Sequence, residues 1–151
     1  MCRKWILFGL IFLLLGSVSA ADLESHDFDD YFSMDVPKGA EFTNDAINST
    51  ENGTDNVITV YMGDTLEIVY LDSPLLFENH ASDYFEVIFE ALYPGVDLVS
   101  ADQDGNLTVF KVVDDGEIFS VVATASENKM VFVIGDDLDL VKQMGDSIKF
   151  K

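Results

Sequence analysis

The chain has 151 residues and is strongly acidic, with 28 Asp and Glu residues, only 8 Lys and Arg residues and a formal net charge of −20 at pH 7. Such a charge repels nucleic acids and anionic lipid surfaces and attracts cations and basic partners. The sequence therefore predicts a protein that does not bind nucleic acid. The charges are scattered, which is also typical of a surface whose acidity only keeps a protein soluble.

Residues 1–20 have the three-part layout of an export signal. A basic pair precedes an unbroken apolar run over residues 5–15, and small residues lead up to Ala20. Cleavage between Ala20 and Ala21 would give a secreted or extracytoplasmic protein. The alternative is an uncleaved anchor, because the apolar stretch reaches the lower limit of a membrane span. The membrane is then contacted only through this segment.

Cys2 is the single cysteine, and it precedes the apolar run. A lipoprotein needs a cysteine after that run, so lipidation is not expected. The cleaved chain would hold no disulfide, no cysteine nucleophile and no cysteine-ligated metal. Its core must be stable without covalent cross-links.

The rest of the chain divides into two parts. Residues 21–30 are polar, acidic and without apolar periodicity, which predicts a flexible tether. Residues 31–151 have the length and apolar content of a single domain. Within them, residues 48–56 contain no apolar side chain and predict an exposed loop. This loop and a later turn carry acceptor sequences for N-glycosylation, or chance matches to them, at Asn48, Asn52 and Asn106.

Alternating or β-rich apolar runs bounded by turn residues predict most of the domain's strands. Their short connections force antiparallel neighbours, because a parallel crossover needs a dozen or more residues. In the first long hairpin, we expect Ile58, Val60 and Met62 to share a face with the apolar residues of the following strand, Leu66, Ile68 and Tyr70. The expected strands are 31–36, 40–47, 57–62, 66–71, 96–101, 107–113, 118–125 and 130–134, with a last apolar segment at 147–150.

Two segments have helical periodicity. The first runs over residues 84–92, with Asp83 as its expected N-cap and a Pro-Gly pair after its end. The second runs over residues 138–144, with Asp136 and Asp137 as its expected N-terminal cap and Gly145 as its expected end. The element order predicts an α+β domain. Its mostly antiparallel sheet of six to seven strands would be covered by two helices in an α/β/α sandwich.

The two ends of the domain resemble those of the PsbP and DcrB-like superfamily of small exported proteins. The resemblance lies in Phe32-Ser-Met-Asp-Val-Pro-Lys-Gly39, an opening strand followed by Pro-x-Gly, and in the closing Ser147-Ile-Lys-Phe150. It implies a central antiparallel sheet between helices and an accessory or binding role rather than catalysis.

The histidines and carboxylates offer little for catalysis. A serine triad would need His26, in the expected tether, or His80, which lies near Ser82 and Asp83, and no nucleophile-elbow motif accompanies either histidine. Pairs of carboxylates arise by chance in so acidic a chain. We expect no enzyme, the alternative being a small hydrolase that uses carboxylates or His80.

The most metal-like string is Asp102-x-Asp104-Gly105-Asn106, because alternating carboxylate and amide oxygens suit calcium. In an EF-hand the glycine is the sixth residue of the loop and the twelfth is a glutamate, whereas here the glycine is the fourth and the twelfth is Val113. The string therefore predicts a hairpin turn, and a calcium-type cation module is the alternative.

The sequence as a whole predicts an exported, acidic, non-enzymatic accessory or binding domain at the cell envelope. It would be a monomer without a cofactor, and its partner would be an envelope protein or a small ligand.

Overall fold

The computed structural model describes residues 22–51, 53–78 and 80–151. The predicted export signal, including Ala20 and Ala21, lies outside the described residues, and so does Asn52. The strands are β1 (Leu23–Phe28), β2 (Phe32–Pro37), β3 (Thr43–Glu51), β4 (Thr54–Met62), β5 (Leu66–Asp72), β6 (Asp97–Asp104), β7 (Leu107–Asp114), β8 (Glu117–Ser126), β9 (Lys129–Gly135) and β10 (Lys149–Phe150). The helical segments are α1 (Pro74–Phe77), the 3₁₀ turn η2 (Ala81–Tyr84), α2 (Phe85–Leu92) and α3 (Leu138–Asp146).

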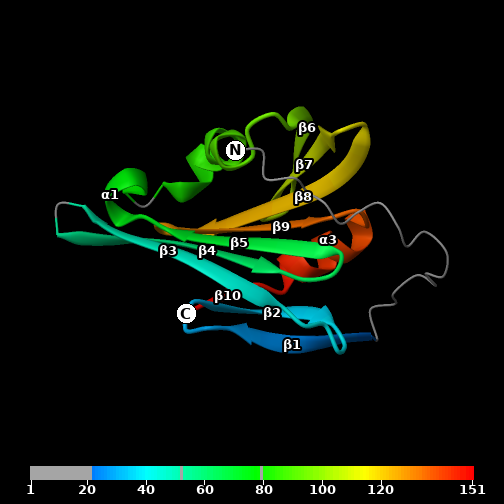
Figure 1. Ribbon diagram of the computed structural model, residues 1–151, viewed down its shortest axis with the longest axis horizontal. Helices are drawn as coiled ribbons and strands as arrows, with labels where there is room; N and C mark the ends of the chain where they lie inside the picture. Colours follow the sequence, from blue (N-terminus) through cyan, green and yellow to red (C-terminus); the bar gives the residue numbers. More distant parts are fainter. Residues whose placement is uncertain (1–21, 52, 79) are drawn as a thin grey trace.

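The strands form two antiparallel sheets, so the prediction of a mostly antiparallel α+β domain is confirmed. The large sheet has seven strands in the order β3-β4-β5-β9-β8-β7-β6, and the small sheet has the order β1-β2-β10. In Figure 1, α1 and α2 lie on one side of the large sheet, and α3 and the small sheet lie on the other. The prediction of a single sheet covered by helices alone was incomplete, because a second sheet covers part of one face.

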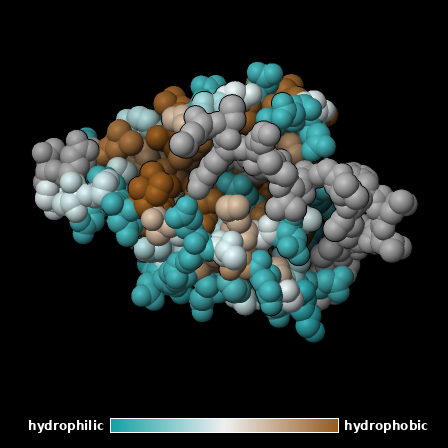
Figure 2. All heavy atoms as spheres, in the orientation of Figure 1, coloured by the Kyte–Doolittle hydropathy of each residue, from teal (hydrophilic) through white to brown (hydrophobic). Residues whose placement is uncertain are grey.

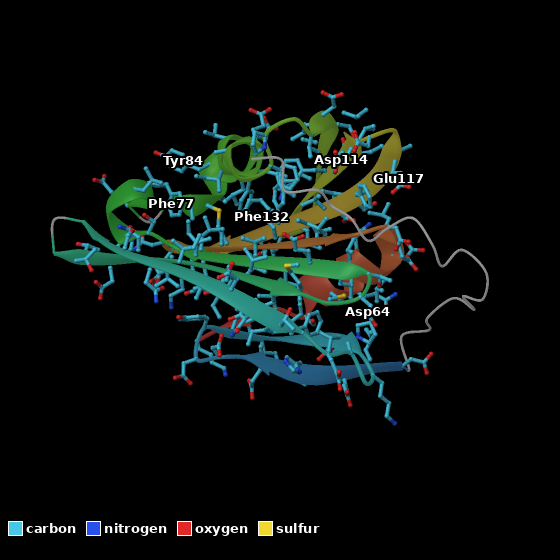
Figure 3. The ribbon with its side chains drawn as sticks, viewed as in Figure 1. Asp64, Phe77, Tyr84, Asp114, Glu117 and Phe132 are labelled. Atoms are coloured by element: carbon cyan, nitrogen blue, oxygen red, sulfur yellow. The ribbon has the colours of Figure 1, made fainter. Side chains whose placement is uncertain are left out.

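The central strands of the large sheet are buried on both faces. Along β9, Phe132 packs on the helical side against Phe85 and Phe89, with ring centroids 6.0 and 5.8 Å away. Its neighbour Val133 packs on the other side, against the small sheet and α3. Figure 3 shows Phe77, Tyr84 and Phe132 gathered on the helical side. Because each fully buried side chain of this size contributes about 1.5–3 kcal/mol, these two cores dominate the stability.

The expected tether is instead strand β1. Its residues pair with β2 from Leu23 opposite Pro37 to Phe28 opposite Phe32, and the Phe28 side chain is 1% exposed. An edge strand needs only one buried anchor and backbone hydrogen bonds, so a polar, non-periodic composition was a poor guide here. For the same reason, the prediction of a loop at 48–56 was wrong, because β3 and β4 continue there as paired strands.

The facing residues of the β4–β5 hairpin also differ from the expectation. Ile58 pairs with Leu71 and Val60 pairs with Val69. Since residues directly opposite each other share a face, Leu66, Ile68 and Tyr70 lie on the other face, toward the small sheet. A register shift of one residue exchanges the two faces of a strand, and the three-residue connection after Met62 sets that register.

The two predicted helices exist, with different starting details. The first begins at Phe85 after η2, and neither Asp83 nor Tyr84 caps it through a side chain. Its buried residues are Phe85 and Phe89, whereas Val87 is 62% exposed. In α3, the Asp137 carboxylate accepts a hydrogen bond from the Leu140 N–H at 3.1 Å, which confirms the predicted cap. Gly145 lies inside this helix rather than after it.

Candidate functional site

A cleft of about 390 Å³ lies between the β1 end of the small sheet and the start of β3, and we call it the β1–β3 cleft. Phe28 and Tyr61 are almost fully buried, whereas Phe42 and His26 are half-buried and Asn44 is exposed. The cleft is lined by His26, Asp27, Phe28, Asp29, Phe42, Thr43, Asn44 and Tyr61.

Aromatic rings form the apolar part of the β1–β3 cleft. The Phe42 ring meets the Phe28 ring edge-on at 5.3 Å and lies 5.7 Å from the His26 ring. The Tyr61 ring meets Phe28 at 4.9 Å, also edge-on. Because these rings come from β1, β4 and the segment before β3, the cleft exists only where the two sheets meet. Aromatic rings and a few polar groups are the usual lining of ligand sites.

Asp29 supplies a carboxylate at the tip of the β1–β2 hairpin. It has a left-handed backbone, with φ of 51°, which Asp and Asn tolerate better than most residues. Its Oδ2 accepts a hydrogen bond of 2.5 Å from the Tyr61 hydroxyl. Burial, and then this carboxylate, raise the pKa of Tyr61 far above its ordinary value, so Tyr61 remains a neutral donor.

Asp27 supplies the second carboxylate, and it already holds an ammonium group. The Lys151 Nζ lies 2.8 Å from the Asp27 Oδ1 and donates to the Asp29 backbone carbonyl at 3.3 Å. The hydrogen bond and charge of Lys151 lower the pKa of Asp27. The Lys151 backbone is fixed as well, because its N–H donates to the Tyr31 carbonyl at 3.0 Å.

The expected cation candidates lie at the far edge of the large sheet. The string from Asp102 to Asn106 forms the β6–β7 hairpin, with Gly105 at φ of 60°, which confirms the predicted turn. The Asp104 carboxylate makes an ion pair with the Lys142 ammonium, so a metal ion would have to displace that lysine. Within the described part of the chain, His, Cys, Asp and Glu side chains form no group of three that could hold a metal ion.

The candidates for hydrolysis are dispersed. The His80 side chain is 72% exposed, and its Nδ1 lies 3.9 Å from the Asp83 carboxylate. Glu67 accepts a hydrogen bond from the Tyr93 hydroxyl and Asp72 accepts one from Tyr70, at separate places in the fold. Of the two histidines, His26 lines the β1–β3 cleft, whereas His80 is an exposed side chain.

Two of the three possible glycosylation sites are described, and both are exposed. Asn48 lies on the edge strand β3, and Asn106 lies in the β6–β7 turn. Neither lines the β1–β3 cleft.

An apolar surface lies on the helical side of the large sheet, away from the cleft. Figure 2 shows hydrophobic atoms gathered at the α1 end of the molecule. Leu76 of α1 is 53% exposed, and Ile47 of β3, which pairs with Ile58, is 60% exposed.

Most of the cleft residues carry no signal in the sequence that would bring them together. Phe42, Asn44 and Tyr61 are separated in the chain and meet only through the β3–β4 pairing, in which Asn44 lies opposite Tyr61. The one available signal is His26 followed by Asp27 and Asp29, in the segment whose composition predicts a tether and which forms β1 and the turn after it.

Comparison with known proteins gives no identification: neither the known family models nor the curated proteins yield a match to this chain. Across the described residues, no helix has both the length and the apolar character that crossing a membrane requires.

Proposed function

We propose that the protein is an exported, acidic, non-enzymatic binding domain of the cell envelope, and that the β1–β3 cleft holds its ligand or a group of its partner. The export signal predicted from residues 1–20 supports the location. The resemblance of the two ends of the domain to the PsbP and DcrB-like proteins supports an accessory role.

The observation that carries the proposal is the composition of the β1–β3 cleft. It combines a volume of about 390 Å³, aromatic rings and a small set of polar groups, which is the usual make-up of a ligand site. Its walls come from two sheets that pack through buried aromatic residues, so the cleft is largely preformed. A preformed site loses little conformational entropy when it binds.

The bonding of the carboxylates in the cleft favours binding over catalysis. Asp29 accepts the Tyr61 hydrogen bond, and Asp27 holds Lys151. A general base needs an accessible carboxylate or imidazole beside a reacting group. The alternatives, a calcium-type module at Asp104 and a hydrolase at His80, have weaker support. Asp104 is paired with Lys142, and His80 is a surface side chain.

Site-specific photo-cross-linking tests this proposal, because it captures weak ligands in place. A benzophenone amino acid replaces Asn44 in the full chain, which is then exported by its own host. The matched control carries the same residue in place of Glu117, which is exposed at the start of β8 and lies far from the small sheet in Figure 3.

We expect a discrete adduct from position 44 and none from position 117. No adduct from position 44, or the same adducts from both positions, would overturn the proposal that the cleft is a binding site.

A further inference from the structure

We propose that the group bound in the β1–β3 cleft is an alkylammonium ion, from either a free amine or a lysine side chain. This inference rests on the proposed function and names the ligand chemistry of the same site. Four observations lead to it.

The first observation is the sign of the charge. Among the described residues that line the cleft, none is Lys or Arg, and two, Asp27 and Asp29, are carboxylates. The whole chain carries a net charge of −20, so the field at any cleft on its surface favours cations. A carboxylate or phosphate ligand would meet two like charges, of which Lys151 offsets only the one on Asp27.

The second observation is that the chain already places an ammonium at the rim of this cleft. Lys151 bonds at once to the Asp27 carboxylate and to the Asp29 carbonyl. The β1 end and the hairpin tip therefore present acceptor oxygens at the spacing that a primary ammonium needs. An ammonium group has three N–H donors and no acceptor.

The third observation is the aromatic wall. Phe42 and His26 are half-buried, and their rings form a tilted pair 5.7 Å apart. Ring faces attract cations, and they also pack against the methylene chain of an amine. A metal ion would gain little from this wall, because Mg²⁺ and Ca²⁺ require several oxygen ligands.

The fourth observation is the neutral Tyr61. Its hydroxyl donates to Asp29, which fixes the orientation of that carboxylate and leaves its other oxygen free of this bond. Beside it, Asn44 and Thr43 are exposed and offer neutral oxygens as further acceptors. Fixed acceptors strengthen binding because they need no reorganisation.

Lys151 is then an internal competitor for the incoming ammonium. Its ion pair with Asp27 is solvent-exposed, with the Asp27 side chain 74% accessible, so it is easily exchanged. An amine that reaches Asp27 must displace Lys151, and removal of the Lys151 charge should tighten amine binding.

The test is a calorimetric titration of the full exported protein with three probes of equal length: cadaverine, 1,5-pentanediol and glutarate. We expect binding of cadaverine alone. Binding of glutarate or of the diol as tightly as cadaverine would overturn the inference.

Matched variants locate the binding. Asp29→Asn keeps the hydrogen-bond acceptor and suits the left-handed backbone, and we expect it to weaken cadaverine binding about tenfold. Phe42→Leu keeps an apolar side chain without a π face, and we expect a loss of about three- to fivefold. The control Asp30→Asn removes one charge from the same turn but not from the lining, and we expect a change of less than about twofold at physiological salt. Equal effects of Asp29→Asn and Asp30→Asn would reduce the inference to general charge attraction and overturn it.

Lys151→Gln tests the competition. We expect cadaverine to bind about two- to fivefold more tightly, because a surface ion pair of ordinary strength no longer opposes it. An unchanged or weaker affinity would contradict the role of Lys151.

Two further measurements are needed. One distinguishes a free amine from a lysine side chain, and the other distinguishes the proposal that the cleft is a binding site from the proposal that its ligand is an ammonium. The peptide acetyl-Val-Lys-Val-Lys-Val-amide binding more tightly than cadaverine would indicate a lysine-bearing partner, and the reverse order a free amine. If the cross-link at position 44 forms while neither probe binds, the cleft is a binding site and the ammonium inference is wrong.

Discussion

The Tyr61 hydroxyl donates a hydrogen bond of 2.5 Å to the carboxylate of Asp29, joining β4 of the large sheet to the hairpin tip of the small sheet. Both residues line the β1–β3 cleft. This link positions a carboxylate in the cleft, and it also has a measurable effect on the ionisation of Tyr61.

We expect Asp29→Asn to lower the pKa of Tyr61, because the anionic acceptor opposes tyrosinate formation. Burial, the larger cause, remains, so the pKa of Tyr61 should stay above that of an exposed tyrosine. NMR of the Tyr61 ring carbon during an alkaline titration measures the change. The control is Tyr70, whose pKa is also raised by burial and should not move. An equal shift at both rings would contradict the direct contact.

The same raised pKa values predict the alkaline limit of stability. A tyrosine with a raised folded pKa contributes stability that is fully present below its unfolded value of about 10 and is lost as the pH rises above it. We therefore expect the free energy of urea unfolding to fall steadily above pH 10, and to fall less in Tyr61→Phe than in the wild type. Parallel curves for the two proteins would contradict this.

The pKa of Asp72 is shifted in the opposite direction to the pKa of Asp27. Burial raises the pKa of Asp72, although Lys129 and Tyr70 partly offset it. A carboxylate with a raised folded pKa lowers the stability as the pH rises through its unfolded value of about 3.9 toward the folded one. We expect Asp72→Asn to gain stability relative to the wild type between pH 3 and pH 7, measured by urea unfolding. A relative loss over that range would show that the bond to Tyr70 or the charge of Lys129 dominates.

The N-cap of α3 offers a matched pair of neighbouring aspartates. Asp137→Ala should cost about 1 kcal/mol, because the Leu140 N–H loses its acceptor. Asp136→Ala changes the same net charge without removing a cap, and we expect an effect within about 0.5 kcal/mol. Denaturant unfolding of both variants measures the difference. Equal losses would assign the effect to charge rather than to capping.

Phe132 carries the packing between β9 and α2. Phe132→Ala should destabilise the fold by about 3–5 kcal/mol, since the side chain is 0% exposed and its neighbours Phe85 and Phe89 cannot fill the cavity. Phe132→Leu keeps most of the volume and should cost less. The control is Val87→Ala, at an exposed position of α2, and it should be nearly neutral. A small effect of Phe132→Ala would mean that α2 is not held through this residue.

The parts of the fold that can be predicted from the sequence are those with a strong local pattern of apolar and turn residues. Strands from β4 to β9 are apolar, bounded by turn residues and joined by short connections, so their existence and antiparallel pairing were predictable. Strand β1 is held by the burial of Phe28 and by pairing with β2, and a single aromatic residue in an acidic segment gives no periodicity. The split into two sheets depends on how α3 and β10 return to β2, through Phe150 opposite Phe32. That contact spans most of the chain and has no local signal.

The candidate site was less predictable than the fold for the same reason. Phe42 precedes a polar edge strand, which has no apolar periodicity. Tyr61 lies in β4, and the prediction of which β4 and β5 residues share a face was wrong. The sequence therefore does not bring these two residues together. His26 and Asp27 were visible as a polar pair, but their place beside Phe42 required the small sheet.

Intermolecular NOEs between cadaverine and the full protein would show whether an amine binds in the β1–β3 cleft. We expect NOEs from the amine methylene protons to the ring protons of Phe42 and Tyr61, and we expect them to weaken in Asp29→Asn, which removes a carboxylate from the cleft lining. The control Glu117→Gln, which removes an exposed carboxylate elsewhere, should keep them. NOEs to other parts of the surface, or bound cadaverine without any NOE to these two rings, would contradict the assignment of the β1–β3 cleft as the binding site.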